Sequence, residues 1–372
     1  QASQGESPFV LGNRTVYGVM PDWNPAEIIG RTPRRLASSL YRYLIMDEVW
    51  ARQRAEFGYR DVRPQPLMRS FAGQPYVDVR AVFNSFIPAG LPDELATDLV
   101  DHYLTRLEEN PHLHDKVEFE IAITCLPFDF EYRAEPLVEA GFSSADLERL
   151  ETELGAITRG AFDRFESGRD LEDIDTLEDR FERIVEADLP PLRAARYLLE
   201  DCRRLGTLPF AHLARTAFVA VSLLRSLERK EIIEDGDTSR FLNSLDTVAR
   251  DFEQDGYRVS AGDLEWERFV ETYGHLRPGT YDITSPAYAS DPEGYLQPTV
   301  ETASKPSTHP DPRELWDETT RAAIESELAE IGLPADCERF IDFLEGAIEG
   351  REYSKFVFSK NLSEALECIG SF

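Results

Sequence analysis

A histidine and an arginine stand two residues apart at the start of a stretch rich in Gly and Pro. His275 and Arg277 open the run 274–310, in which no long apolar pattern interrupts the Pro, Gly, Ser and Thr residues. A loop of this length inside a compact domain is usually functional, and functional residues concentrate on loops. His275 is therefore a candidate for proton transfer or phosphate contact, and Arg277 for binding an anion. The alternative is that His275 only anchors the loop through a hydrogen bond.

A second group of charged residues belongs to one β-like stretch. Arg69 and Arg80 could each hold a phosphate or a carboxylate, because a planar guanidinium donates two parallel hydrogen bonds. The alternative is that Arg80 pairs with Asp78 on one face of a strand.

His212 precedes Arg215 by three residues on an expected helix, so the two share a face. His212 is a candidate binding residue, although a buried histidine with satisfied hydrogen bonds is the default interpretation.

The metal, disulfide and nucleotide motifs that are recognisable in sequence are missing. The six His are dispersed, and the pair His112 and His114 beside Asp115 is typical of an exposed helix end rather than of a metal site. The four Cys are scattered without CxxC spacing, which favours buried thiols in a reducing cytoplasm over zinc or disulfides. No Gly-rich phosphate loop, HExxH or GxSxG occurs. We therefore predict no metal ligands in this chain.

The charge balance limits the possible partners. The formal net charge is −30, which repels nucleic acid and anionic lipid. Of the 40 basic residues only five are Lys. Abundant acids with few Lys are typical of a protein that stays soluble in high salt, so most carboxylates are expected on a solvated, halophilic surface. The sequence shows no signal peptide and no apolar run of about 20 residues, which predicts a cytoplasmic protein that binds no membrane.

The apolar patterning positions these residues on a mainly α fold with a small α+β element. Helical spacing is clear in 36–57, 92–110 and much of 136–255, and it returns in 315–332, 335–350 and 351–369. Strands are expected at 15–20, 66–71, 76–83 and 116–123. We expect the later helices to form a bundle around five apolar residues: Phe218, Val221, Leu224, Leu242 and Leu245.

Breaks in these patterns divide the chain into five segments. They are a flexible N-terminal segment (1–14), an α+β subdomain (15–135), a helical bundle (136–273), a long Pro/Gly-rich loop (274–312) and C-terminal helices that pack on the bundle (313–372). The chain begins with Gln1 and ends at Phe372 directly after a helical pattern. We expect both ends to be cuts in a longer protein.

Three stretches resemble the central part of phosphoenolpyruvate-synthase-like phosphotransferases. They are Met20–Gly30, Arg69–Arg80 continuing through Phe83–Pro88, and Tyr273–Ile283 with Ser285–Pro286, and the tail Arg351–Phe356 also fits. The resemblance covers roughly residues 16–365. It is closest to the branch that contains the L-glutamine kinase of capsular phosphoramidate synthesis, whereas the third stretch is shared more widely with phosphoenolpyruvate synthases and rifampin phosphotransferases.

The resemblance implies a reaction in which ATP phosphorylates a histidine on a swivelling domain, which then carries the phosphoryl group to an acceptor. This chain has neither the Gly-Gly-x-x-Ser/Thr-x-His signature of that domain nor a recognisable ATP-grasp segment. The implied role is a helical substrate-binding domain for the acceptor, with ATP and Mg²⁺ bound by domains outside it. The fragment alone is then inactive.

An acceptor such as L-glutamine or a related amide or amino acid would need an Arg for its carboxylate and an acid for its ammonium group. Asp78 and Glu27 are the candidate acids. One alternative is a fragment of a phosphoenolpyruvate synthase, which would use pyruvate and need a C-terminal barrel. Another is a non-catalytic helical scaffold.

Overall fold

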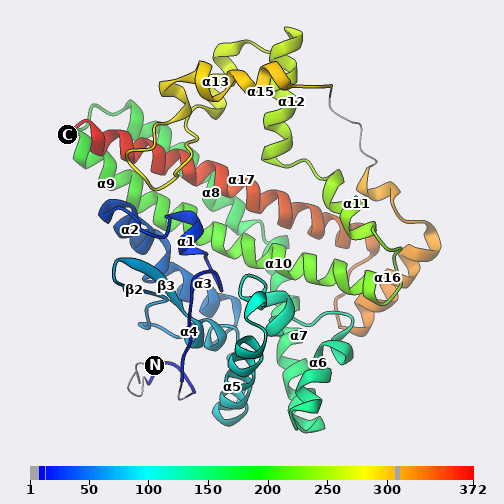
Figure 1. Ribbon diagram of the computed structural model, residues 1–372. Coiled ribbons are helices and arrows are strands. Elements are labelled where there is room, and N and C mark those ends of the chain that lie inside the picture. The colour runs from blue at the N-terminus through cyan, green and yellow to red at the C-terminus, as the bar shows by residue number, and fades with distance from the viewer. Residues whose placement is uncertain (1–7, 13, 306–310) are drawn as a thin grey trace.

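Two long helices that run side by side in opposite directions form the centre of the computed structural model, which describes residues 8–12, 14–305 and 311–372 (Figure 1). They are α10 (Leu208–Arg229) and α17 (Cys337–Gly370). A π-helical turn, η4 (Cys202–Thr207), joins α10 to α9 (Pro191–Asp201), so that Pro191–Arg229 is one continuous helix. A Cβ on Gly206 would lie 2.7 Å from the Cβ of Phe358, so only glycine allows η4 to approach α17 this closely.

The helix Pro191–Arg229 is long and apolar enough to cross a membrane by length and composition. However, 72% of its most apolar window is buried inside the protein. This burial is that of a core helix in a soluble protein.

The remaining bundle helices pack around this pair. Ser143 starts the first long one, because its hydroxyl accepts from the Asp146 amide while the Asp146 carboxylate accepts from the Ser143 amide. The helices are α6 (Phe130–Glu139), α7 (Ser144–Glu166), α8 (Arg169–Glu186), α11 (Asp237–Ser244) and α16 (Glu318–Glu330). The predicted bundle core is confirmed for Leu224 and Leu245, which are buried, and Val221 and Leu242 pack against the same cluster.

The small sheet confirms the predicted mainly α fold with an α+β element. Its antiparallel strands lie in the order β1 (Tyr17–Gly18), β3 (Gln74–Asp78) and β2 (Met68–Phe71). Around it lie six helical segments: α1 (Pro25–Ile28), α2 (Arg35–Tyr41), η1 (Arg42–Met46), α3 (Val49–Phe57), α4 (Val79–Asn84) and α5 (Asp93–Glu109).

Two of the expected strands differ in the structure: 76–83 is a strand only as far as Asp78, and 116–123 is not a strand. Strand β3 ends at Asp78, whose carboxylate accepts from the Ala81 amide and so starts helix α4; every residue of α4 is buried, which removes the alternation that marks a strand. In place of the expected strand 116–123 the structure has a π-helical turn, η3 (Val117–Ile121), followed by extended chain. Here Arg133 donates to the carbonyls of Phe119 and Ala122, which a neighbouring strand would otherwise have satisfied.

Other boundaries also differ from the prediction. The expected helices 335–350 and 351–369 are one helix, α17, because Gly350 is packed against Leu171 and Leu213 instead of ending it. The expected helix 237–255 is two, since Thr247 begins α12 (Val248–Ala261) by accepting from the Arg250 amide. Residues 1–7, 13 and 306–310 lie outside the described part. Of the N-terminal segment 1–14, which the sequence predicts to be flexible, the structure therefore describes only residues 8–12 and 14. There, the Leu11 amide donates to Asn84 Oδ1 over 2.7 Å.

A cap of shorter helices lies above α17 in Figure 1. It consists of α12, α13 (Trp266–Tyr273), α14 (Pro292–Tyr295) and α15 (Gln297–Thr302). The described part of the expected long loop 274–312 therefore contains two short α-helices, α14 and α15, and a 3₁₀ turn, η5 (Tyr288–Ser290). The cap has an apolar cluster of its own around Phe269 and Leu296, and Phe356 of α17 packs against it. The largest cluster, by contrast, joins the sheet region to α8, η4 and α17.

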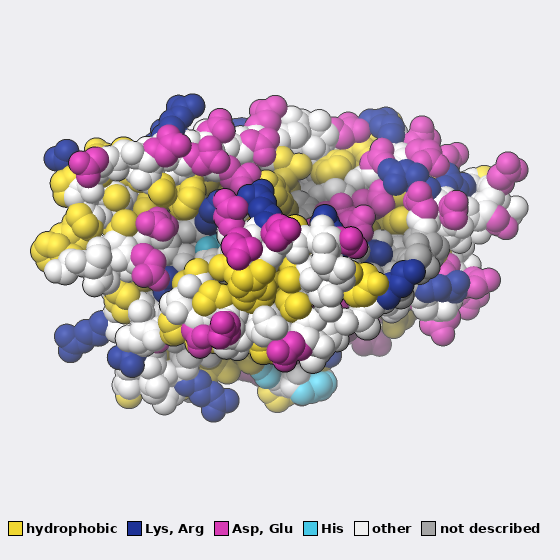
Figure 2. Space-filling view, turned by 90° about the horizontal axis from the view of Figure 1, so that it is seen from above, with side chains coloured by type: hydrophobic (Ala, Val, Ile, Leu, Met, Phe, Trp, Pro, Cys, Tyr) yellow, Lys and Arg dark blue, Asp and Glu magenta, His cyan; other side chains and the backbone are white. Residues whose placement is uncertain are grey.

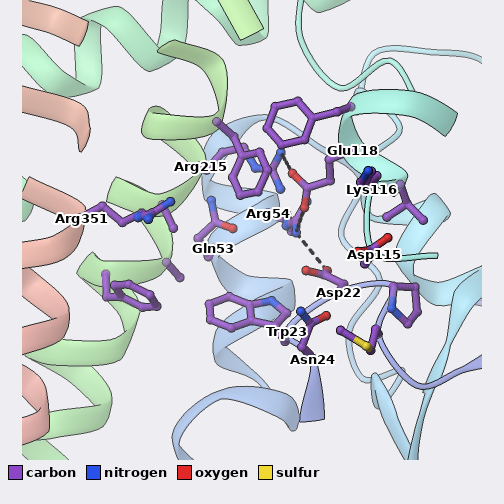
Figure 3. Close-up of a pocket in the computed structure, with 18 of the residues that line it drawn as sticks. Asp22, Trp23, Asn24, Gln53, Arg54, Asp115, Lys116, Glu118, Arg215 and Arg351 are labelled. Carbon is purple, nitrogen blue, oxygen red and sulfur yellow. Dashed lines mark hydrogen bonds and ion pairs between the residues drawn. The ribbon is translucent and has the colours of Figure 1, made fainter. Parts of the chain in front are cut away.

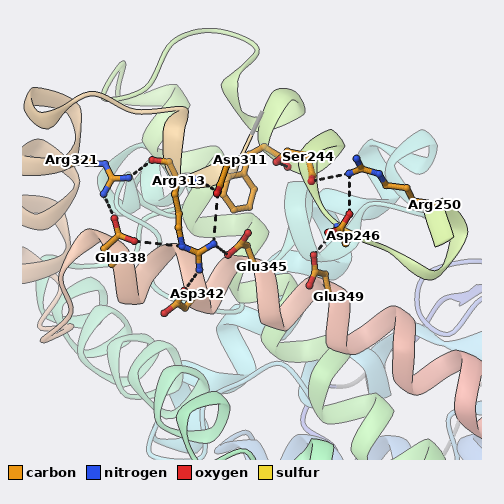
Figure 4. A network of polar contacts seen from close by, with 11 residues as sticks. Ser244, Asp246, Arg250, Asp311, Arg313, Arg321, Glu338, Asp342, Glu345 and Glu349 are labelled. Atoms are coloured by element: carbon orange, nitrogen blue, oxygen red, sulfur yellow. Dashed lines mark hydrogen bonds and ion pairs between the residues drawn. The ribbon is translucent and has the colours of Figure 1, made fainter. Parts of the chain in front are cut away.

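An ion-pair network holds the segments beside the cap to α17 (Figure 4). The guanidinium of Arg313 lies within 4 Å of four carboxylates, among them Asp342 at 2.5 Å and Glu345 at 2.9 Å. Glu349 of α17 accepts from the Asp246 amide at 2.8 Å, just before α12 begins. Elsewhere, Asp and Glu side chains spread across the upper face with Lys and Arg among them (Figure 2).

Candidate functional site

A cleft with two adjoining pockets lies between the sheet region, α10, α17 and the cap. Trp23, Phe210, Glu352 and Lys355 line both pockets. The first, which we call the charged pocket, has a volume of about 270 Å³ and contains nine charged residues in its wall. The second, the aromatic pocket, has a volume of about 580 Å³ and is bounded by the cap. Volumes of this order suit small-molecule ligands.

Five separate parts of the chain build the charged pocket (Figure 3). They are the loop 20–24, helix α3 with Gln53 and Arg54, the segment 115–119 with η3, the first turns of α10, and α17 with Arg351. The π-helical form of η3 places Glu118 in the wall between Arg54 and Arg215. A π turn at such a position is common at functional sites.

Four buried charges form a chain across the floor of this pocket. Arg54 Nη2 lies 3.0 Å from Asp22 Oδ2 and 3.5 Å from Glu118 Oε1, and Arg215 Nη1 lies 2.7 Å from Glu118 Oε2. Each of the four side chains is less than 10% exposed. Phe86 lies behind the arginines, with its ring centre 4.1 Å from the Arg54 guanidinium carbon and 5.1 Å from that of Arg215.

Burial and neighbouring charge act against each other in this group. Burial raises the pKa of Asp22 to about 6, although the Arg54 guanidinium opposes the shift. Burial, with Arg215 nearby, lowers the pKa of Arg54. For Arg215 burial is again the largest influence and acts to lower the pKa, but Glu118, Tyr59 and Asp22 together outweigh it and raise the pKa. Both arginines therefore stay charged beside two carboxylates.

The backbone is strained where the chain enters the cleft. Trp23 and Asn24 have φ angles of 53° and 29°, in the left-handed region that a bulky residue such as Trp rarely adopts. The hydroxyl of Tyr41 donates to the Trp23 carbonyl and helps to hold this conformation. Neither Asp22 nor Asn24 caps helix α1 with its side chain; Asp22 pairs with Arg54 instead. Strain of this kind concentrates at binding sites, and here it places the indole between the two pockets.

The aromatic pocket brings together three of the residues that the sequence indicated: Glu27, His275 and Arg277. Glu27 is exposed and accepts from Asn24 Nδ2 at 3.1 Å. The ring of His275 lies edge-on to Phe356, with ring centres 4.6 Å apart, and its Nδ1 lies 3.2 Å from the Thr272 carbonyl oxygen. Burial lowers the pKa of His275 to about 4, and Lys360 adds to the effect. The neutral imidazole is therefore the form present near pH 7.

Arg277 is held by protein groups rather than open to a ligand. Its guanidinium donates to Ser363 Oγ at 2.9 Å, to the Ser285 carbonyl at 3.0 Å and to Glu367 Oε1 at 2.7 Å. The side chain is only 3% exposed. It ties the segment after α13 to the C-terminal part of α17 and so holds one wall of the aromatic pocket.

Replacing Arg277 with Lys should therefore destabilise that wall. An ammonium group cannot make this set of directed bonds, and each lost hydrogen bond to a charged group costs about 1.5–3 kcal/mol. We expect amide hydrogen exchange in 274–290 to become at least tenfold faster. Arg268→Lys is the matched control, because Arg268 pairs with Glu271 on the exposed face of α13. Equal exchange in the two variants would contradict the anchoring role.

The structure places Arg69, Asp78 and Arg80 together, but outside the cleft. Burial and Asp78 raise the pKa of Tyr17, and Arg69 and Arg80 lower it, so all three charges lie around this ring. Asp78 accepts from Thr15 Oγ1 at 2.6 Å, and Arg80 Nη1 donates to the Gly12 carbonyl at 2.9 Å. Among the described residues the Asp78 carboxylate accepts from Thr15, Gln65 and Ala81 and not from Arg80. These contacts tie the start of the chain to β3 and α4.

His212 is buried beside the cleft. Its Nε2 lies 3.1 Å from Glu56 Oε2, and its ring stacks on Phe57 with centres 6.3 Å apart. Burial lowers its pKa, and the bond to Glu56 opposes this. It lines neither pocket, whereas Arg215, on the same helix, lines the charged pocket.

Sequence reasoning missed most of the charged pocket. Gln53, Arg54 and Glu118 lie in no motif of the sequence, and Trp23 and Arg351 occur there only within longer stretches. The only available signal was the resemblance itself, since Trp23 and Arg351 lie in the stretches that carry it. Phe86 of the second stretch supports the arginines from behind, whereas Arg69 and Arg80 of the same stretch do not reach the pocket.

Within residues 8–12, 14–305 and 311–372 no group of three or more His, Cys, Asp or Glu could hold a metal ion. His112 is exposed and His114 is half-buried, and His114 Nδ1 lies 2.9 Å from the Pro111 carbonyl oxygen. No family model, no curated protein and no solved structure matches the chain.

Proposed function

We propose that this chain is the acceptor-binding region of an ATP-dependent phosphotransferase that carries its phosphoryl group on a histidine of another domain. The observation that carries the proposal is the convergence of separated stretches on one cleft. Residues from 20–28, 273–281 and 351–359, three segments at least 70 positions apart, line the two adjoining pockets. These are the first and third stretches and the tail on which the resemblance to phosphoenolpyruvate-synthase-like proteins depends.

The charges of the cleft support a small acceptor with both an anionic and a cationic group. The charged pocket has five cationic and four anionic side chains in its wall, in a protein whose net charge is −30. Its amide side chains, Asn24 and Gln53, suit a ligand with a further polar group. L-Glutamine or a related amide or amino acid is the acceptor that we propose. Glu27, His275 and Arg277 then belong to the wall of the adjoining aromatic pocket.

The reactive parts would be supplied by other domains in this proposal. ATP and Mg²⁺ would bind an ATP-grasp unit, and a swivelling domain with a phosphorylated histidine would deliver the phosphoryl group in the cytoplasm. Catalysis of phosphoryl transfer depends mainly on positioning and on cations near the transferring oxygens. Lys355 and Arg351, both from α17, provide such cations in the wall of the charged pocket.

A thermal-shift screen at high salt concentration tests the acceptor. L-Glutamine should raise the melting temperature, because a ligand at 100 times its Kd stabilises the folded state by about 2.7 kcal/mol. Lys355→Met should abolish the rise, since Lys355 lines both pockets. Arg69→Ala is the matched control, a cation of the second stretch that lines neither pocket, and it should leave the rise intact.

The other outcomes of the screen distinguish the alternatives. A rise with pyruvate or phosphoenolpyruvate, and none with amino acids, would favour a phosphoenolpyruvate synthase. A rise that Arg69→Ala abolishes and Lys355→Met does not would move the acceptor to the sheet. No rise with any of these compounds would contradict the proposal and favour a scaffold.

A further inference from the structure

The floor of the charged pocket contains a group of hydrogen-bond donors that no protein group satisfies. Within the described residues, Arg54 Nε and Nη1, Arg215 Nε, Gln53 Nε2 and Trp23 Nε1 are buried and have no hydrogen-bond partner. Arg215 Nη1 and Glu118 Oε2 also lack an aligned hydrogen bond, but they form an ion pair with each other at 2.7 Å. Gln53, Arg54 and Arg215 are each at most 3% exposed. A buried donor without an acceptor costs about 1–3 kcal/mol, so a group of this kind is rarely tolerated without a reason.

All of these unpartnered atoms are nitrogens that donate, and all four residues line one pocket. Gln53 and Arg54 are adjacent residues of α3. Arg215 comes from α10, and Trp23 comes from the strained loop at the entrance of the cleft. Figure 3 shows the four side chains grouped around the Asp22–Arg54–Glu118 chain, with Arg351 directed toward Gln53 from α17. Their complement is a group that offers several acceptors and no donor.

The two carboxylates on the floor do not fill this role. Asp22 and Glu118 accept from Arg54 Nη2, and Glu118 also pairs with Arg215 Nη1, which leaves the other N–H groups of both guanidiniums unused. A guanidinium has five N–H donors, so one or two ion pairs do not satisfy it. The aromatic ring of Phe86 lies near both guanidiniums and offers no lone-pair acceptor.

We propose that Trp23, Gln53, Arg54 and Arg215 form an oxyanion subsite on the floor of the charged pocket, which takes a carboxylate or a phosphoryl group. Oxyanion atoms accept several hydrogen bonds at once, and those from guanidinium groups are the strongest. This inference rests on the proposed function only in taking the charged pocket as part of the ligand cleft. It assigns residues that neither the sequence motifs nor the proposed acceptor require.

The indole nitrogens provide a direct test. The protein has four Trp, so a sample labelled with ¹⁵N in the indole gives four signals, and Trp23→Phe identifies one of them while keeping an aromatic ring at this position. Inorganic phosphate and acetate are titrated separately, with potassium chloride held constant. We expect the Trp23 signal to move downfield and to saturate, while the signals of Trp50, Trp266 and Trp316 stay in place.

Variants then test the other donors without removing a buried charge. Gln53→Met keeps the size of the side chain and should raise the half-saturating concentration of the anion about fivefold, the effect of one lost hydrogen bond. Gln74→Met is the matched control, because Gln74 is exposed at the start of β3 and lines neither pocket. Arg54→Lys follows as a second variant, and its fold is checked by the positions of the other three indole signals.

Each result has one meaning for the subsite. A response to both anions supports a general oxyanion subsite, a response to phosphate alone a phosphoryl subsite, and a response to acetate alone a carboxylate subsite. A Trp23 signal that responds to neither, or saturates equally in Gln53→Met, overturns the inference. If the anions bind while every amino acid fails in the thermal screen, the proposed acceptor is wrong and the subsite stands.

Discussion

Replacing Glu118 with Ala should lower the free energy of unfolding by about 3–5 kcal/mol. Removing one partner of a buried ion pair leaves the other charge uncompensated, and this cost exceeds the net contribution of the pair itself. Glu118 is the carboxylate shared by Arg54 and Arg215, so its loss affects two buried guanidiniums at 3.5 and 2.7 Å. Urea unfolding at neutral pH measures the change.

Glu120→Ala is the matched control for this experiment. Glu120 is two residues away in the same π-helical turn and is exposed. Its removal should change stability by no more than about 0.5 kcal/mol, as is usual for surface positions. If Glu118→Ala costs no more than this control, water reaches the floor of the charged pocket and the four charges are not a closed group. Adding phosphate should recover less stability in Glu118→Ala than the variant lost, because an anion in the pocket cannot replace a bonded carboxylate.

A second large effect should come from acidification, through His275. Its pKa is about 4 in the folded protein, chiefly because of burial, against about 6.5 in an unfolded chain. Between these values the unfolded chain binds more protons, so the free energy of unfolding falls as the pH falls. The loss attributable to His275 is about 2 kcal/mol at pH 5 and reaches about 3 kcal/mol below pH 4. Lys360 and Arg277 act in the same direction.

Comparison of the native protein with His275→Gln isolates this contribution. Urea unfolding at pH 7 gives the packing cost of the substitution, and the same measurement at pH 5 gives the titration. Between pH 7 and pH 5 the free energy of unfolding should fall by about 2 kcal/mol less in the variant than in the native protein. Asp22 acts in the opposite direction, because its pKa is raised to about 6 and protonation stabilises the folded state, but it contributes equally to both proteins. Equal losses would show that the imidazole reaches water.

The local chemistry of the sequence was enough to predict the helices and the fold class. The strand expected at 15–20 and the helix expected at 92–110 depend on neighbouring residues, and β1 and α5 lie where expected. Alternation over 116–123 gave a wrong strand because Glu118 turns inward to two arginines and Arg133 satisfies the local carbonyls. Such a choice depends on residues far away in the sequence.

For the candidate site, too, the sequence predicted one part and the tertiary structure decided the other. Sequence alone identified stretches 20–30 and 273–283 and the tail after Arg351, and these do line the cleft. Only the tertiary structure decided which of their residues face it. Arg69, Asp78 and Arg80 have the right chemistry, yet their hydrogen bonds hold the start of the chain to the sheet. Gln53, Arg54 and Arg215 carry no motif, and packing of α3 against α10 is what brings their unsatisfied donors together. A hydrogen-bonding group acts on a ligand only when the fold leaves it without a protein partner, and residue type does not determine that.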